Sequence, residues 1–226
     1  MTYSTYIHIT DEFVEGLKRY IRHANVPLAE IVEVFAGNGA LATRLGLPDH
    51  RNYSDNLLFV NNGYDDEVNE RWDRKPPGVV VETAYETVLR FGAEEGHTIR
   101  LLIMGAPLPA HSNFCPTYEA AKALHYLFDA RMLYIGERPS AAFASPKFFK
   151  HTIEAEDETF DQFVLANYDG SGGYFASESF DAPVNVQPYL LKFAPCNDPT
   201  CDCRDDTRIR RDLEAWYRQD VVEGGV

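Results

Sequence analysis

The sequence predicts an α/β protein built on a doubly wound, mostly parallel sheet of seven strands, with a late antiparallel strand pair. Short apolar runs alternate with helical patterns through five predicted strands. A glycine-bearing turn joins the first of these strands to its helix, and two further strand-like runs follow close together near the end of the chain. This alternation is typical of a parallel sheet that binds ligands at the carboxyl ends of its strands.

The composition is that of an ordinary globular protein. With 226 residues the chain can hold one large domain with a substantial core. Hydrophobic residues make up 45% and charged residues 25% of it. The sequence shows neither an apolar run long enough to span a membrane nor a basic and then apolar leader at its start. We therefore expect a cytoplasmic protein with no membrane partner.

The net charge of −14, from 35 acidic and 21 basic residues, bears on the class of partner. A surface this negative repels phosphate backbones, so nucleic-acid binding is disfavoured although a local basic patch could still override it. The densest arginine cluster alternates with aspartates between positions 204 and 212. Such mixed charge indicates a solvated helix face with ion pairs along it.

The first elements follow from capping and apolar patterns. Residues 10–24 form an amphipathic helix with Thr10 as its cap, and the helix ends before Pro27. An apolar strand over residues 31–35 then leads through a glycine turn into a helix that Gly46 terminates.

The glycine turn is the first candidate site. Gly37 and Gly39 allow a sharp bend and a close approach of the backbone to a ligand. Glu33 lies inside the apolar strand, where a carboxylate needs a hydrogen-bond partner. An ordinary β–α turn without a ligand is the alternative, because short glycine motifs are common.

A second candidate is Asp55, at the end of a short strand predicted over residues 50–55. It follows Glu33 at about the separation at which nucleotide-binding α/β units place a carboxylate against ribose hydroxyls. Each carboxylate oxygen can accept one proton of a cis-diol. A plain loop aspartate that caps a backbone turn remains the alternative.

The central region continues the alternation. Strands are expected over 78–81, 100–104 and 131–135, helices over 85–91 and 116–128, and a connection over 56–78 with a helical turn near 67–72. The candidate residues at the ends of all these strands are Gly37, Gly39, Asp55, Glu82, Gly105 to Pro109 and Glu137. Because the carboxyl ends of parallel strands share one edge of the sheet, these residues are expected to lie together.

The last third changes character. A helix is expected over 146–153, strands over 160–166 and 189–193 as the antiparallel pair, a loop over 169–173, and a final helix over 206–221.

Four cysteines are present, three of them close together as Cys196, Cys201 and Cys203. Thiolates at this density can hold zinc, but a fourth ligand would have to be Cys115 or a histidine brought in by the fold. Zinc, a disulfide and free loop thiols all remain open, and the sequence alone assigns no metal ligands.

Together these residues resemble a class I S-adenosylmethionine-dependent methyltransferase of a poorly characterised subgroup. The likeness is carried by Glu33–Gly39 (EVFAGNG), by Ser54-Asp55 and by the late strand pair; Leu101 to Pro109 and Leu133 to Glu137 add a weaker one. The resemblance implies a Rossmann-like domain over residues 28–195. An N-terminal helical segment (1–27) would precede it, and a cysteine-bearing loop and C-terminal helix (196–226) would pack on it.

The resemblance also implies a cofactor, S-adenosylmethionine, and its contacts. Gly37 and Gly39 would cradle the methionine part, Asp55 would hold the ribose, and Glu82 or Thr83 would lie near adenine. The implied cofactor-binding set is Glu33, Ala36, Gly37, Gly39, Asp55, Glu82, Thr83 and Gly105.

Two departures from the family pattern stand out. Phe35 occupies the place where the family often has its first glycine. The fourth strand ends in Gly105-Ala106-Pro107-Leu108-Pro109, unlike the Asn/Asp-Pro-Pro-aromatic motif of enzymes that methylate amino groups. In addition, Cys115 precedes Pro116, whereas a cytosine methyltransferase would have Pro-Cys.

The candidate catalytic or acceptor-orienting residues are His111, Tyr118 and Glu137. The methyl acceptor is unidentified, and a small molecule or protein is favoured over nucleic acid. One rival is a non-catalytic protein with the same fold, acting as a binding or structural subunit. The other is a dinucleotide oxidoreductase, which expects a third glycine where this chain has Ala42 or Thr43.

Overall fold

A computed structural model of the chain describes residues 7–56, 78–107, 115–138, 143–170 and 186–223, with side chains up to residue 218. These ranges form an α/β fold around one seven-stranded sheet in the order β3-β2-β1-β4-β5-β7-β6. The strands are β1 (Ile31–Val34), β2 (Tyr53–Asp55), β3 (Val80–Val81), β4 (Leu101–Gly105), β5 (Arg131–Gly136), β6 (Thr152–Glu154) and β7 (Gln187–Phe193).

Neighbouring strands from β3 to β5 pair in parallel, whereas β7 runs antiparallel to both β5 and β6. The prediction of a mostly parallel sheet with a late antiparallel pair is therefore confirmed.

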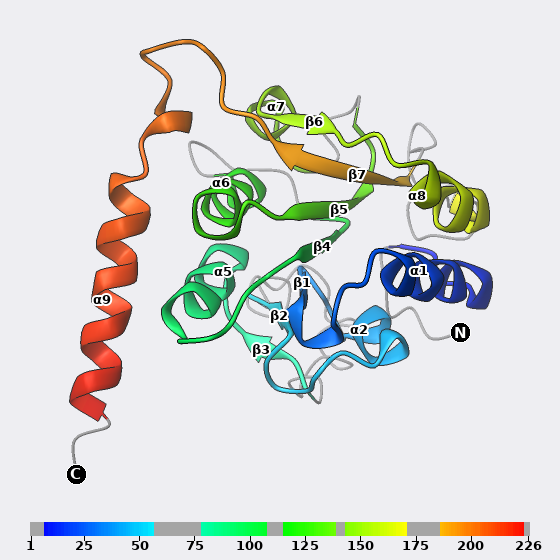
Figure 1. Cartoon of the computed structure of the whole chain (residues 1–226), viewed down its shortest axis with the longest axis horizontal. Helices are drawn as coiled ribbons and strands as arrows, with labels where there is room; N and C mark the ends of the chain where they lie inside the picture. The colour runs from blue at the N-terminus through cyan, green and yellow to red at the C-terminus, as the bar shows by residue number, and fades with distance from the viewer. Residues whose placement is uncertain (1–6, 57–77, 108–114, 139–142, 171–185, 224–226) are drawn as a thin grey trace, which may run out of the picture.

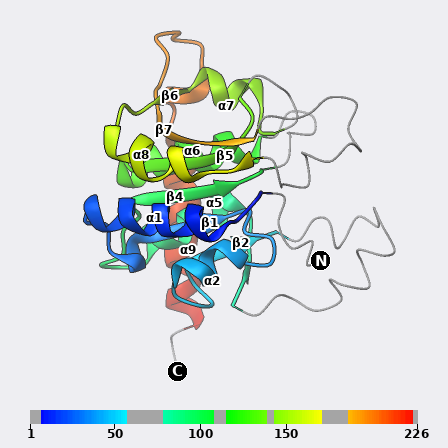
Figure 2. The same cartoon turned by 90° about the vertical axis from the view of Figure 1, so that its right-hand side faces the viewer.

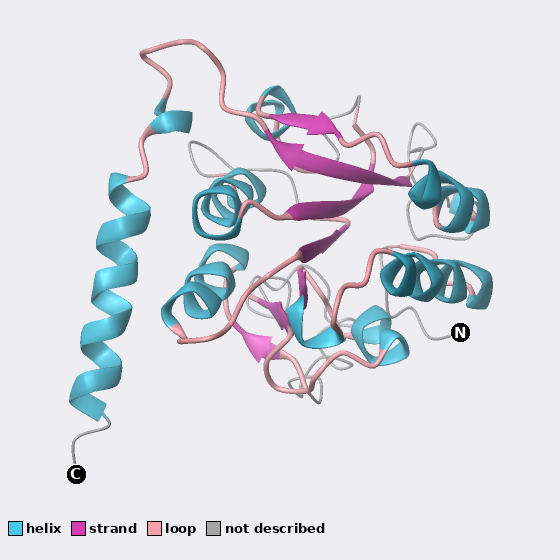
Figure 3. Ribbon diagram, viewed as in Figure 1, coloured by secondary structure: helices cyan, strands magenta, loops and turns pink. Residues whose placement is uncertain are grey.

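Helices cover both faces of the sheet (Figure 1). Figure 2 views the face that carries α1 (Asp11–His23), α2 (Ala40–Leu45) and α8 (Glu158–Phe163). The opposite face carries α5 (Ala84–Ala93) and α6 (Pro116–Phe128), and α9 (Thr207–Glu223) contacts α5 from outside (Figure 3). Among these helices, none combines the length and apolar character that a membrane crossing requires.

The centre of the sheet is the core of the protein. Every residue of β1 and β4 is buried, as expected for parallel strands covered on both faces. Apolar residues from α1 at one end of the chain to α9 at the other, such as Phe13 and Ile209, belong to one continuous hydrophobic cluster. The described elements thus share a single core.

Local sequence signals explain most element boundaries. The side chain of Thr10 accepts a hydrogen bond from the N–H of Phe13 and caps α1 as predicted. Pro116 opens α6, where its missing N–H costs nothing. Thr83 and Glu86 form a reciprocal capping box that opens α5. The two helices predicted from capping and periodicity, 10–24 and 116–128, are confirmed.

One strand and one helix boundary were predicted wrongly. Residues 160–166 were expected to be a strand, but Glu158–Phe163 is α8 and Leu165–Asn167 is a 3-10 turn. The partner of β7 is instead β6, which lies within the predicted helix 146–153; α7 (Pro146–Lys150) ends before it. The helical turn predicted near 67–72 and part of the loop 169–173 lie outside the described residues.

Asp157 is the physical reason for this error. Its carboxylate accepts hydrogen bonds from the N–H groups of Thr159 and Phe160, which starts a helix where the apolar pattern alone favoured a strand. The same side chain pairs with Arg131 of β5 at 2.7 Å and accepts from the hydroxyl of Tyr20 at 3.3 Å. Asp157 therefore ties α8 to α1 and to the sheet.

We expect Asp157→Ala to lower the free energy of unfolding by about 1–3 kcal/mol, because it removes a helix cap and the partner of a half-buried arginine. Urea denaturation measures this. Glu158→Ala, which changes an exposed acid one position further on, is the matched control and should change stability by less than about 0.5 kcal/mol. Equal effects of the two substitutions would contradict the role given to Asp157.

Candidate functional site

The candidate site lies where the order of strands reverses. From β1 the chain continues outward to β2 and β3, and then returns to β4 on the other side of β1. At such a point the connections leave in opposite directions, so a crevice opens beyond the carboxyl ends of the two strands. Here the turn after Val34 and the turn after Gly105 lie at the carboxyl ends of those two strands.

Both turns hold backbone conformations that favour glycine. Gly37 and Gly39 have φ angles of 56° and 73°. Phe35 and Ala106, which are not glycines, have φ angles of 58° and 43°. Such residues cost on the order of 1–2 kcal/mol each and cluster at functional sites. The departure at Phe35 therefore changes the residue but keeps the backbone conformation that a glycine would adopt.

Glu33 is the most unusual group of the site. Its side chain is buried in the middle of β1, only 3% exposed, and its Oε2 atom has no hydrogen-bond partner among the described residues. Burial raises the pKa of Glu33 to about 8, the backbone N–H of Ala42 offsets part of this, and the nearby carboxylate of Asp55 raises it further. Glu33 is thus mostly protonated at neutral pH, and its Oε2 atom can still accept a hydrogen bond.

Asp55 ends β2 and faces the glycine turn. Its Oδ2 atom accepts a hydrogen bond from the N–H of Gly37 at 2.8 Å. The parallel pairing of β1 with β2 produces this contact, since it sets Val34 beside Ser54. The sequence prediction that the glycine turn and Asp55 lie together is therefore confirmed, and Asp55 also shapes the turn.

The two glycines serve different purposes. A Cβ atom on Gly39 would lie 2.7 Å from the ring of Tyr53, so this glycine lets the turn pack on β2. A Cβ atom on Gly37 would meet no atom of the described residues within 4 Å. Of the pair, only Gly37 has room for a Cβ atom among the described residues.

Ala36 and Gly105 complete the walls of the site. Ala36 is buried and its N–H donates to the carbonyl of Ser54, which continues the pairing of the strands beyond β1. A Cβ atom on Gly105 would lie 4.0 Å from Oε1 of Glu33 and 3.4 Å from Ile7. The end of β4 therefore lies directly beside the buried acid.

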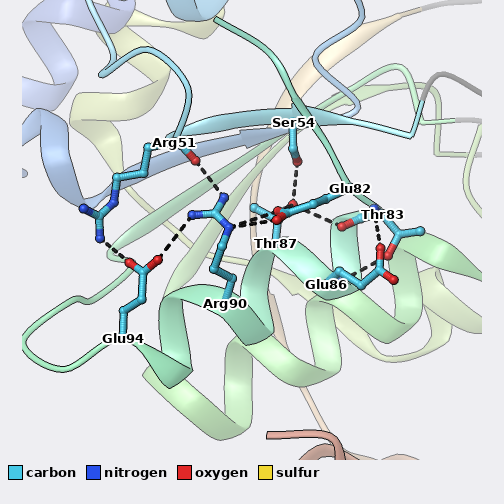
Figure 4. A network of polar contacts seen from close by, with 8 residues as sticks. All are labelled: Arg51, Ser54, Glu82, Thr83, Glu86, Thr87, Arg90 and Glu94. Carbon is cyan, nitrogen blue, oxygen red and sulfur yellow. Dashed lines mark hydrogen bonds and ion pairs between the residues drawn. The ribbon is translucent and has the colours of Figure 1, made fainter. Parts of the chain in front are cut away.

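Glu82 and Thr83 are engaged in a polar network at the end of β3, shown in Figure 4. The carboxylate of Glu82 pairs with Nε of Arg90 at 3.0 Å and accepts from the hydroxyl of Thr87 at 3.1 Å. Thr83 caps α5 through the N–H of Glu86. The hydroxyl of Thr87 also shares a hydrogen bond of 2.6 Å with the hydroxyl of Ser54, which holds α5 against β2. An adenine contact by Glu82 or Thr83 stays a prediction.

Sequence reasoning missed Arg90, which links this network to the loop before β2. Its guanidinium donates to the carbonyl of Arg51 and lies 3.8 Å from Glu94, which also pairs with Arg51. The spacing of Arg90 and Glu94 on one face of a helix was the available signal.

The three candidate catalytic residues are not brought together by the described residues. His111 lies outside the described ranges. Glu137 directly follows β5, and its carbonyl accepts from the hydroxyl of Tyr134 at 3.1 Å. Tyr118 is fully buried on α6, and its hydroxyl donates to Asp202 at 3.1 Å. Tyr118 thus holds the C-terminal segment, and these contacts give its predicted catalytic role no support.

A cavity of about 500 Å³ lies elsewhere, at the amino-terminal ends of β4 and β5. Its walls include Arg131 and Asp157, which already pair with each other. Parallel sheets bind ligands at the opposite edge, so we assign the site to the turns after β1 and β4.

The arrangement places two carboxylates at one edge of the sheet, Glu33 buried and Asp55 partly exposed. Oε2 of Glu33 can accept a hydrogen bond from a cationic or neutral donor, and Asp55 lies half-buried against the N–H of Gly37. Such a pair suits a ligand that carries an amino group and hydroxyl groups. No family model matches the chain, and no curated protein matches it either.

The two glycines provide a matched test of this geometry. Both have positive φ angles, so Gly37→Ala and Gly39→Ala share the backbone cost of about 1–2 kcal/mol. Only the second also forces a methyl group into the ring of Tyr53. We expect Gly39→Ala to destabilise the protein by at least about 1 kcal/mol more in urea denaturation. Equal destabilisation would contradict the packing role of Gly39.

The raised pKa of Glu33 predicts a pH dependence of stability. The folded protein holds this proton up to about pH 8, whereas the unfolded chain releases it near its ordinary value of 4.5. The free energy of unfolding should therefore fall as pH rises from 4.5 through 8, by about 1.4 kcal/mol for each pKa unit of the difference. Glu33→Gln, which keeps the shape without the ionisation, should remove this decrease.

The measurement is a series of urea denaturations between pH 5 and pH 9 on the wild type and on Glu33→Gln. Glu30→Gln, which alters a less buried acid just before β1, is the control and should keep the wild-type profile. Parallel profiles for the wild type and Glu33→Gln would show that Glu33 is ionised throughout.

Proposed function

We propose that the chain binds S-adenosylmethionine beyond the ends of β1, β2 and β4 and transfers its methyl group to a small-molecule or protein acceptor. The observation that carries the proposal is the buried Oε2 atom of Glu33, which has no partner among the described residues. An acceptor placed at the strand reversal, next to a glycine turn, fits the α-ammonium group of this cofactor.

The architecture supports the same proposal. Helices lie on both faces of the sheet, as in a doubly wound Rossmann-like domain (Figure 1). The antiparallel β7 follows the parallel strands, which favours the methyltransferase over the dinucleotide oxidoreductase. The position where an oxidoreductase would have its third glycine is occupied by Ala42 or Thr43, both in α2.

The residues present fit the cofactor in three places. Glu33 would bind the ammonium group. Asp55 would accept hydrogen bonds from the ribose hydroxyl groups while keeping its hydrogen bond to the N–H of Gly37. No described residue lies within 4 Å of a Cβ position on Gly37, which would let the methionine part approach the backbone there. The bound cofactor supplies an activated methyl group, and the protein contributes the positioning of the two reactants.

The net charge of the protein indicates the class of methyl acceptor but not its identity. The net charge of −14 disfavours a nucleic-acid acceptor. Small molecules and proteins remain, and the described residues provide no acceptor-binding group near Glu33 and Asp55 that would choose between them.

A second function, a binding or structural subunit without catalysis, is favoured by two specific contacts. The carboxylate of Glu82 is occupied by Arg90, and the hydroxyl of Tyr118 is occupied by Asp202. Two of the residues proposed for adenine binding and catalysis therefore have structural tasks. Cofactor affinity separates the two functions.

Calorimetric titration with S-adenosylmethionine and with its demethylated product tests the proposal. We expect binding that weakens at least about tenfold in Asp55→Ala, because a charge-assisted hydrogen bond is worth about 1.5–3 kcal/mol. Below pH 8 the affinity should rise with pH in the wild type, since the ammonium group favours ionised Glu33, and Glu33→Gln should lose this dependence.

Asp161→Ala, an exposed aspartate on α8, is the matched control and should bind as the wild type does. Absence of binding at millimolar cofactor would refute the methyltransferase and leave the non-catalytic subunit. If binding is present, incubation with cofactor carrying a labelled methyl group and a mixture of small molecules and proteins would identify the acceptor.

A further inference from the structure

The C-terminal segment brings four metal-ligating side chains together. Cys196, Cys201 and Cys203 lie within and around the loop that follows β7. His151 lies between α7 and β6, far from them in sequence. One donor atom from each of the four residues lies within 4.8 Å of all the others. The fold therefore supplies the histidine that the sequence alone could not identify.

The antiparallel pairing of β6 with β7 explains this meeting. Thr152 pairs with Phe193, and the N–H of Ala194 donates to the carbonyl of His151 at 2.8 Å. This register places Cys196, two residues beyond Ala194, beside the ring of His151. The 3-10 turn Asp202–Arg204 then brings Cys203 back to the same point, where it is fully buried.

The distances match a tetrahedral zinc site. Zinc binds sulfur at about 2.3 Å and nitrogen at about 2.0 Å, so a tetrahedron separates two sulfur atoms by about 3.8 Å and sulfur from nitrogen by about 3.5 Å. The Sγ atoms of Cys196 and Cys203 are 3.6 Å apart, and Sγ of Cys201 is 3.5 Å from Nε2 of His151. The other separations are at most 4.8 Å, so sulfur–sulfur pairs need a contraction of at most about 1 Å and sulfur–nitrogen pairs of at most about 1.3 Å.

The donor set is selective. Three thiolates and one imidazole are soft ligands that suit zinc better than magnesium or calcium. Nε2 of His151 faces the sulfur atoms, whereas Nδ1 is buried without a partner among the described residues. Four protein ligands leave no position for water, so the site would be structural rather than catalytic.

The surroundings hold the loop in this arrangement. The guanidinium of Arg204 donates to the carbonyl of Cys196 at 2.8 Å, and the hydroxyl of Tyr126 donates to the carbonyl of Cys203 at 3.1 Å. Asp202 accepts from Tyr118 and from Lys147 at 2.8 Å. Backbone carbonyls of Cys196 and Cys203 thus have partners within the loop and on α6.

A disulfide explains the cluster less well. The Sγ atoms of Cys196 and Cys203 are 3.6 Å apart, well beyond a disulfide bond of about 2.05 Å. Pairing any two of the three cysteines would also leave one thiol beside His151. All four cysteines of the chain are free in the structure.

We propose that His151, Cys196, Cys201 and Cys203 bind one zinc ion that fastens the C-terminal segment to α6, α7 and β6. Apart from Cys203, the residues of this segment from 194 to 205 are half-buried or exposed, so apolar burial contributes little to its position. A metal bridge between residue 151 and residues 196–203 would supply the missing constraint. It would also fix the start of α9, which contacts α5.

Metal analysis of the full-length protein tests the proposal. Protein expressed with added zinc and then desalted should contain one zinc per chain when measured by inductively coupled plasma mass spectrometry. Replacement by Co²⁺ should give the visible absorption of tetrahedral cobalt bound to thiolates. Chelator treatment should release the metal and lower the melting temperature.

Matched variants assign the ligands. Cys203→Ser and His151→Asn should reduce bound zinc at least tenfold or shift the cobalt spectrum. Cys115→Ser and His125→Asn change a cysteine and a histidine outside the cluster and should retain one zinc per chain. If a ligand variant does not fold, the zinc content and cobalt spectrum of the wild type still decide.

Three results would overturn the proposal. The first is that the wild-type protein contains no zinc and takes up no Co²⁺. The second is a protein mass lower by two hydrogens, which would show a disulfide within the cluster. The third is equal metal loss in Cys115→Ser and Cys203→Ser.

Discussion

The parallel pairing of β1 with β2 on one side and β4 on the other is the constraint on which the candidate site depends. It places Glu33 in the middle of the sheet, where burial keeps the acid protonated to about pH 8. It also sets the turn after β1 against Asp55 and Gly105. The free energy that the sheet gains from its buried core offsets both the buried carboxyl group and the strained backbone at Phe35 and Ala106.

Most of the fold could be predicted because its signals are local. The helix 116–128 begins at a proline, and continuous apolar runs mark β4 and β5. Residues 146–166 could not be assigned because short apolar runs fit a helix or a strand equally well. There the cap at Asp157 and the pairing of β6 with β7 decided the structure, and the second of these depends on the tertiary fold.

Part of the candidate site could also be predicted from the sequence. The turn residues and Asp55 follow strands whose carboxyl ends must share an edge, so their meeting could be predicted from the order of elements. The partners of Glu82 and Tyr118 could not, because Arg90 and Asp202 come from a helix and a loop whose positions the sequence does not specify. His151 likewise reaches the cysteines only through the register of β6 and β7.

The shortness of the outer strands has a consequence for how the molecule behaves at high concentration. Within the described ranges the two outermost strands are β3, with two residues, and β6, with three. Such short edges expose few backbone N–H and C=O groups to which the strand of another molecule could add. Together with the mutual repulsion of chains that each carry a charge of −14, this opposes aggregation through edge-to-edge pairing of sheets.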